Sequence, residues 1–228
     1  MGEAKGQNLH AELKALIEGA GNKELECRKY LPYAKELLVK VTTKEFLSEA
    51  DEYRGHSGDS DYIVVCKACD EAGIESNHAY IWEVKAPQCY VFEQDTMNRV
   101  KPTKDFISAE NQLLHYYEES KGSDQFRAEF GITHPENVKL GGIVIGSKKT
   151  LVKSSDYLED LIIRLYTRAL DLRRRYLYGH SGVKVIIWDT ILDHLLESPP
   201  ASKVVVQPKS TIIGIKSYPV NIVVDFEK

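Results

Sequence analysis

Residues 80–87, Tyr-Ile-Trp-Glu-Val-Lys-Ala-Pro, place two opposite charges inside a segment that otherwise favours a β-strand. Successive side chains of a strand point to opposite faces, so Trp82 is predicted on one face and Glu83 and Lys85 on the other. The Cα atoms of Glu83 and Lys85 are then about 7 Å apart, and both side chains reach the same side of the sheet. The alternative is a half-buried strand that carries an ordinary surface ion pair.

An acidic residue opens the strand that precedes this one. Asp61 begins the run Asp-Tyr-Ile-Val-Val-Cys-Lys-Ala, which is rich in β-branched residues, and residues 70–78 are polar. Two strands joined in this way predict a β-hairpin. Because directly opposed residues in an antiparallel pair have Cβ atoms about 5 Å apart, Asp61 and Glu83 are expected to lie close together.

Two carboxylates beside a lysine suit the cleavage of a phosphodiester bond. Mg²⁺ prefers oxygen ligands and retains several waters, so one or two protein carboxylates are sufficient to bind it. Asp61 and Glu83 are the expected ligands of Mg²⁺, with Mn²⁺ as the alternative ion. Lys85 is expected to orient the attacking water or to neutralise charge on the phosphate.

A predicted helix over residues 104–120 follows the hairpin and supplies Gln112. The spacing of three and four residues places Gln112, His115 and Tyr116 on one helical face. A glutamine directed at the hairpin would position Lys85 or the water. The alternative is an exposed polar residue with no role.

The remaining pattern predicts an α/β protein whose central mixed sheet is flanked by helices. Residues 1–44 are predicted to hold N-terminal helices, residues 45–197 the main domain, and residues 198–228 a β extension after Ser198-Pro199-Pro200. Pro32 is expected to kink or delay the second N-terminal helix. Further elements are predicted as strands at 39–48, 138–146, 183–188, 202–207, 211–216 and 219–226, and as helices at 9–20, 23–40, 155–178 and 191–196.

The charge balance limits the class of partner. The chain has 228 residues and a formal net charge of −4, which argues against a polybasic nucleic-acid binder but not against a nuclease with an acidic centre. No apolar run approaches the length of a membrane helix, and the N-terminus lacks the apolar core of a signal peptide. We therefore expect a cytoplasmic protein that does not enter a membrane.

Together these motifs resemble the PD-(D/E)xK nuclease superfamily, in which an acidic residue starts one strand, Glu-x-Lys lies on the next and a helix follows. The matching residues are Asp61, Glu83-Val84-Lys85 and the helix with Gln112. More narrowly, Glu-Val-Lys-Ala-Pro at 83–87 and the Gln112-to-Tyr117 helix resemble the Shedu-type domain of bacterial anti-phage defence proteins. The resemblance covers about residues 45–197. It implies a Mg²⁺-dependent endonuclease that acts on DNA and assembles into a dimer or tetramer.

The sequence also departs from the superfamily pattern. The proline that usually precedes the first acid is Ser60 here, and Asp59 is an alternative to Asp61. Many members add an acid from the first helix, and for that metal ligand we favour Glu26, with Glu24 and Glu12 left open. A catalytically silent member of the same fold, which binds nucleic acid or protein, is the main alternative function.

Basic residues concentrate on the predicted helix at 155–178. Arg164, Arg168 and Arg175 fall on one stripe of that helix. One interpretation is a track for the phosphate backbone of nucleic acid. The other is a solvated helix face balanced by Asp160 and Asp171.

Overall fold

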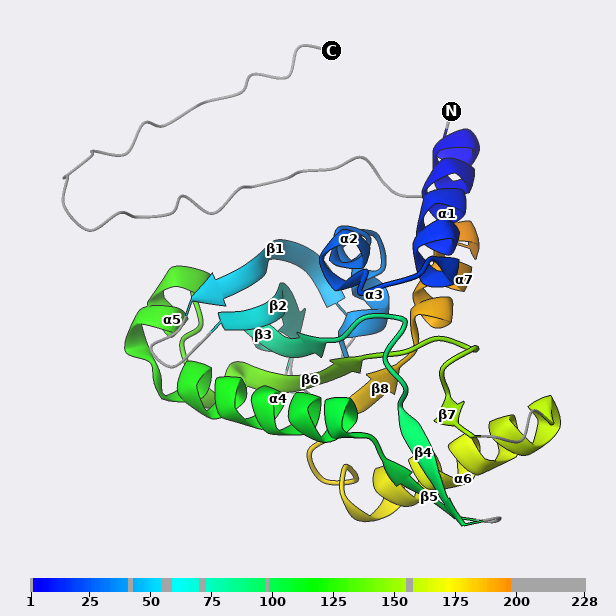
Figure 1. The fold of residues 1–228 in the computed structure, drawn as a ribbon. Helices are drawn as coiled ribbons and strands as arrows, with labels where there is room; N and C mark the ends of the chain where they lie inside the picture. The colour runs from blue at the N-terminus through cyan, green and yellow to red at the C-terminus, as the bar shows by residue number, and fades with distance from the viewer. Residues whose placement is uncertain are drawn as a thin grey trace.

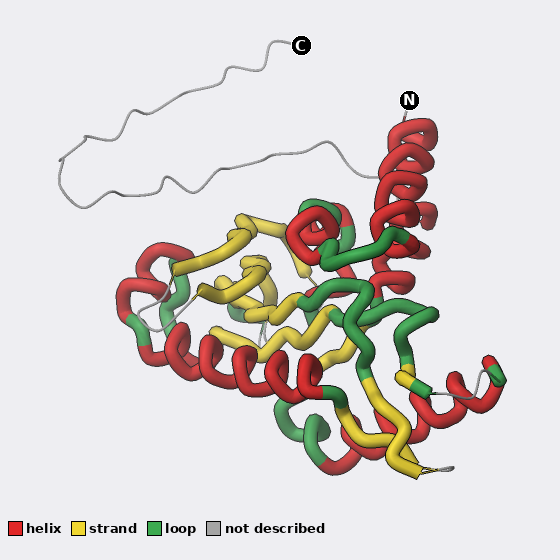
Figure 2. Tube along the Cα trace, viewed as in Figure 1, coloured by secondary structure: helices red, strands yellow, loops and turns green. Residues whose placement is uncertain are grey.

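A mixed five-stranded sheet forms the centre of the molecule (Figures 1 and 2). The structure, a computed structural model, describes residues 2–40, 43–54, 59–69, 73–96, 99–154 and 158–197. The sheet order is β1-β2-β3-β6-β8, and the strands are β1 (Thr43–Arg54), β2 (Asp59–Cys69), β3 (Glu75–Val84), β6 (Val138–Val144) and β8 (Lys184–Ile186). The predicted strands beyond residue 198 lie outside the described residues.

Strand direction changes across the sheet. Strands β1, β2 and β3 are antiparallel neighbours, whereas β6 pairs in parallel with both β3 and β8. The prediction of an α/β protein with a mixed central sheet is therefore confirmed. The expected hairpin of β2 and β3 is also present, and its register runs from Tyr62 opposite Trp82 to Cys69 opposite Glu75.

Each face of the sheet packs against its own hydrophobic core. Ile63 and Ile81 point into one core together with residues of α4 (Lys104–Gly122). Tyr62 and Trp82 point into the other core, beside N-terminal residues and α7 (Trp188–Glu197). This division follows the two-residue period of a strand and agrees with the predicted faces of residues 80–84.

The N-terminal residues pack directly on the sheet. Helix α1 (Gly2–Glu18) precedes three short segments, α2 (Glu24–Arg28), a 3-10 turn (Leu31–Tyr33) and α3 (Lys35–Leu38). The predicted second helix is therefore broken, because proline has no N–H group to continue the hydrogen-bond ladder and Pro32 lies in the 3-10 turn. The indole of the fully buried Trp82 donates to the carbonyl of Leu38 at 2.9 Å, which fixes α3 against β3.

Helix α4 covers the opposite face of the sheet and belongs to the long connection between β3 and β6 (Figure 1). Its first turn is capped by Thr103, whose hydroxyl accepts the N–H of Phe106 at 3.2 Å. Phe106, Ala109 and Leu113 are its buried residues on the core side. The helix therefore presents one stripe to the sheet, as its apolar periodicity predicts.

A smaller sheet lies beside this core. It has the order β5-β4-β7 and consists of β4 (Phe92–Thr96), β5 (Arg99–Pro102) and β7 (Val152–Lys153), with α6 (Glu159–Tyr176) packed nearby. Helix α5 (Asp124–Phe130) and a 3-10 turn (Pro135–Asn137) complete the described elements. The sequence interpretation missed this sheet and α5. Among the described residues, no helix has the length and apolar character needed to cross a membrane.

Candidate active site

The open end of the β2–β3 hairpin carries the predicted acidic pair. Asp61 and Glu83 each lie one residue beyond the opposed pair of Tyr62 and Trp82. The backbone N–H of Val84 donates to Asp61 Oδ2 at 2.9 Å, which ties the aspartate to the neighbouring strand. Asp61 also contributes a negative charge to the environment of Glu83. The two carboxyl groups are therefore adjacent, as the hairpin predicted.

Glu83 and Lys85 form a close ion pair. Lys85 Nζ lies 2.6 Å from Glu83 Oε1, and the two side chains are 17% and 1% exposed. Glu83 is thus buried, so the alternative of a surface ion pair on a half-buried strand does not describe it. Its other oxygen, Oε2, is buried and has no hydrogen-bond partner among the described residues.

The surroundings oppose a full negative charge on Glu83. Burial and the neighbouring Asp61 raise the pKa of Glu83 to about 8, although Lys85 acts in the opposite direction. Burial lowers the pKa of Lys85, but Glu83 and Asp61 outweigh that effect and its pKa is raised. Lys85 therefore keeps its positive charge at neutral pH.

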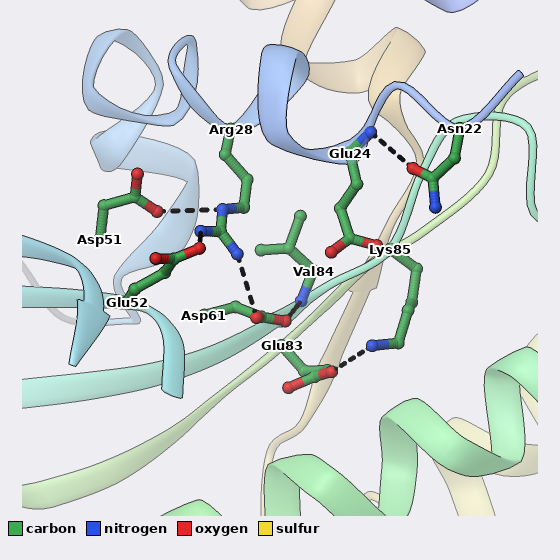
Figure 3. Close-up of polar contacts among 9 residues, drawn as sticks. All are labelled: Asn22, Glu24, Arg28, Asp51, Glu52, Asp61, Glu83, Val84 and Lys85. Carbon is green, nitrogen blue, oxygen red and sulfur yellow. Dashed lines mark hydrogen bonds and ion pairs between the residues drawn. The ribbon is translucent and has the colours of Figure 1, made fainter. Parts of the chain in front are cut away.

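An arginine that the sequence interpretation did not single out binds Asp61 from the other side. The Arg28 guanidinium, from the end of α2, lies 3.1 Å from Asp61 Oδ1 and contacts two acids of β1 (Figure 3). Those contacts are 3.0 Å to Asp51 and 2.6 Å to Glu52. Both oxygens of Asp61 thus accept hydrogen bonds from fixed donors.

Helix α2 brings Glu24, rather than Glu26, towards the centre. Figure 3 shows the Glu24 side chain pointing from α2 towards Lys85. Burial and the charge of Asp61 raise the pKa of Glu24, and Lys85 and Arg28 lower it, which places Glu24 within electrostatic reach of the site. Glu26 instead pairs with Lys23 at 3.2 Å on the surface of α2. The structure thus does not gather Glu26 with Asp61 and Glu83.

The remaining acids proposed from sequence lie elsewhere. Glu12, on α1, accepts hydrogen bonds from Asn8 and Tyr30. Asp59 belongs to β2, but its side chain lies outside the described part of the chain. Glu24 is therefore the acid from the N-terminal helices that the geometry favours.

Helix α4 contributes Gln112 and Tyr116. Gln112 is half-buried, and its side-chain oxygen accepts a hydrogen bond from the Ser108 hydroxyl at 3.3 Å. Burial and the charge of Glu83 raise the pKa of Tyr116, with a smaller contribution from Asp61. Tyr116 therefore lies within electrostatic reach of the acidic pair, whereas His115 is 55% exposed. Gln112 lies one helical turn before Tyr116, and the role expected for it at the hairpin stays a prediction.

One structural observation indicates that the carboxylates of Asp61 and Glu83 suit a hard divalent cation. The unpartnered Oε2 of Glu83 lies beside the Asp61 carboxylate, and a divalent cation bound there would favour the ionised form of Glu83 that burial and Asp61 otherwise oppose. Within the described ranges, no group of three or more His, Cys, Asp and Glu side chains is arranged to hold a metal ion. A pair of carboxylates is nevertheless sufficient for Mg²⁺, which keeps much of its hydration.

The arginines of α6 divide into two groups. Arg173 pairs with Glu110 of α4 at 2.6 Å, and Arg174 pairs with Asp171 at 3.5 Å. Arg164, Arg168 and Arg175 line a shallow surface depression that also contains both Asp160 and Asp171. The structure therefore leaves both interpretations of this face in place.

No protein-family model matches this sequence, and a search of curated proteins finds no match. Function is therefore inferred from the side chains gathered at the hairpin.

Proposed function

We propose that this chain is a metal-dependent endonuclease that hydrolyses phosphodiester bonds of DNA. One observation carries the proposal. Asp61 meets Glu83 and Lys85, which lie more than 20 residues later in the sequence, at the end of one hairpin, and the buried Glu83 has an oxygen without a partner among the described residues. Burying charged groups is costly, and an acid in such a place is a candidate for binding and chemistry.

Asp61 and Glu83 would hold a divalent cation, Mg²⁺ or alternatively Mn²⁺, and Glu24 is the additional acid nearest to them. When bound, such an ion lowers the pKa of water and neutralises charge on phosphate oxygens. The reaction adds the oxygen of water to phosphorus and breaks the bond to one ester oxygen, which leaves with a proton. No redox partner is needed.

Lys85 contributes a positive charge that the protein itself fixes in place. Its ammonium group is oriented by Glu83 and keeps its proton at neutral pH, because both nearby acids favour the charged form. In that state it donates a hydrogen bond to a phosphate oxygen or to the attacking water. We assign the orientation of the same water to Gln112, which lies one helical turn before Tyr116 on α4.

The arrangement of elements supports a PD-(D/E)xK nuclease core. The acid-bearing hairpin is followed by β4 and β5, then by α4 and α5, and then by β6, which pairs in parallel with β3. Within that superfamily we propose a Shedu-type nuclease that acts in anti-phage defence. Assembly into a dimer or tetramer and a cytoplasmic location belong to the same proposal.

Cleavage of supercoiled and linear DNA in Mg²⁺, Mn²⁺ or EDTA tests the proposal. Wild type is compared with Lys85→Ala and with Lys67→Ala, a control in the same hairpin whose surface side chain pairs only loosely with Glu45. We expect metal-dependent nicking by wild type and Lys67→Ala, and a loss of at least about 100-fold in Lys85→Ala. Equal cleavage by Lys85→Ala would show that the assigned site is wrong.

A folded wild type that binds DNA and Mn²⁺ but does not cleave would favour the alternative function, a binding module that retains the fold. Circular dichroism of all three proteins separates a loss of activity from a loss of folding. Absence of both cleavage and Mn²⁺ binding would overturn the proposal.

A further inference from the structure

We infer that Arg28 is a positioning residue that holds Asp61 ready to bind the metal ion. The inference rests on the proposed function and deepens it. Arg28 lies on α2, outside residues 45–197, where the sequence resemblance was found. It therefore makes the N-terminal helices part of the catalytic unit.

Arg28 is a buried charged residue that contacts several carboxylates. Its side chain is 3% exposed, yet it carries a full charge at the junction of α2, β1 and β2. Three carboxylates from two strands surround it: Asp51, Glu52 and Asp61 (Figure 3). Lysine is a poor substitute here, because its single ammonium group lacks the planar fork of five donors with which arginine bridges several acceptors.

One of these contacts, that of Glu52 with Arg28, comes from a residue of β1 with an unusual backbone conformation. Glu52 has a φ of 59°, and it is the only non-glycine residue of the described chain with a positive φ. L-residues avoid this left-handed region because of steric crowding. The Glu52 carboxylate meets Arg28 at 2.6 Å from this conformation. Strand β1 thus has an unfavourable backbone angle at Glu52, the residue whose carboxylate contacts the Arg28 guanidinium.

The consequence for Asp61 is a carboxylate fixed from two directions. Arg28 donates to Oδ1 and the Val84 N–H donates to Oδ2, from different elements. Two donors on two oxygens define the plane of the carboxylate. Each oxygen retains a second lone pair, because a carboxylate offers about four acceptor positions. Asp61 is therefore oriented without being saturated.

Arg28 could orient Asp61 for the metal ion or could compete with the metal ion for Asp61. These two roles predict opposite changes in the affinity for a divalent cation when Arg28 is removed. Without the guanidinium, only the Val84 N–H restrains Asp61, which lies next to the like-charged Glu83. The carboxylate would then turn away from Glu83, and the affinity for a divalent cation would fall. If Arg28 instead occupied the place of the cation, its removal would raise that affinity.

The test removes Arg28 from a background in which its other partners are neutral. Arg28→Ala alone leaves Asp51, Glu52 and Asp61 without their counter-charge, and the resulting loss of stability would be mixed with any loss of metal binding. We therefore compare the double variant Asp51→Asn/Glu52→Gln with the triple variant that adds Arg28→Met. Thermal unfolding in EDTA verifies that both are folded, and electron paramagnetic resonance titration measures Mn²⁺ binding without DNA.

We expect the triple variant to bind Mn²⁺ about 10-fold or more weakly than the double variant, as for other residues that orient a metal ligand. Arg28→Lys in the wild-type background should recover part of the affinity relative to the triple variant. Equal affinity in the double and triple variants would reduce Arg28 to a structural role, and tighter binding would make it a competitor. Either result overturns the inference alone. A folded wild type that neither binds Mn²⁺ nor cleaves DNA overturns the proposed function, and this inference with it.

Discussion

Lys85 Nζ lies 2.6 Å from Glu83 Oε1, and the other oxygen of this buried glutamate is left without a partner. A single ion pair thus compensates only half of the carboxylate. Asp61, on the neighbouring strand, adds negative charge at the same place. The hairpin end therefore combines burial with a carboxylate oxygen that has no hydrogen-bond partner among the described residues.

Glu83→Gln should stabilise the metal-free protein at alkaline pH. The pKa of Glu83 is raised to about 8 from its ordinary 4.5. Between these values the folded protein holds a proton that the unfolded chain has released. The free energy of unfolding therefore falls by up to about 1.4 kcal/mol per pH unit as the pH rises. Glutamine cannot ionise, so the variant lacks this loss.

The measurement for Glu83→Gln is thermal unfolding in EDTA from pH 5 to 9. We expect similar melting temperatures near pH 5 and a higher one for the variant above pH 8. Glu118→Gln, an exposed change on α4, serves as the control. A wild type whose stability does not fall relative to Glu83→Gln across this range contradicts the raised pKa.

Glu24→Gln should weaken Mn²⁺ binding about 10-fold, whereas Glu26→Gln should leave it unchanged. Glu24 points towards Lys85 and lies in the field of Asp61, while Glu26 pairs with Lys23 on the surface. Both residues lie on α2, so the pair is matched in helix and charge. Isothermal titration with Mn²⁺ distinguishes them, and a greater loss in Glu26→Gln would restore the choice made from the sequence.

Gln112→Ala should slow cleavage by about 10- to 100-fold, because misplacing a reacting group by a small distance is costly. Its side chain accepts a hydrogen bond from Ser108 and lies one helical turn before Tyr116, which is within electrostatic reach of Glu83. Mn²⁺ affinity should therefore be unchanged. His115→Ala, on the exposed side of the same helix, is the control for DNA cleavage kinetics. A parallel loss of Mn²⁺ binding in Gln112→Ala would assign Gln112 to the metal instead.

Gly141→Ala should destabilise the fold by about 2–3 kcal/mol, as overpacking a core commonly does. A Cβ at this position of β6 would lie 2.2 Å from Trp82 Nε1 and 2.6 Å from the carbonyl oxygen of Ile81. The indole cannot withdraw easily, because it is fully buried and hydrogen-bonded to Leu38.

Gly122→Ala, at the end of α4, is the control, since a Cβ there meets nothing within 4 Å. Alanine stabilises a helix more than glycine does, so this change should be neutral or slightly stabilising. Urea denaturation compares the two variants with wild type. Equal stability of Gly141→Ala and wild type would mean that β6 does not approach Trp82 as closely as described.

The sequence predicted the hairpin and its two faces because strand alternation is a local property. Residues two apart share a face whatever surrounds them, so Glu83 and Lys85 were predicted together, and β-branched residues marked β2. The smaller sheet was not predicted because its strands show no such alternation. Its strands are only two to five residues long and carry charged residues such as Glu93 and Lys101, so no alternation distinguishes them from a loop.

Local sequence alone determined the β2–β3 hairpin, the mixed α/β class and the proposed trio of Asp61, Glu83 and Lys85, but not the smaller sheet or α5. Only tertiary structure decided which α2 side chains reach them. Arg28 and Asp61 are 33 residues apart, and Glu24 rather than Glu26 points towards the site. The burial that raises the pKa of Glu83 is likewise a consequence of packing by α4 and the N-terminal helices, since desolvation depends on neighbours from the whole chain.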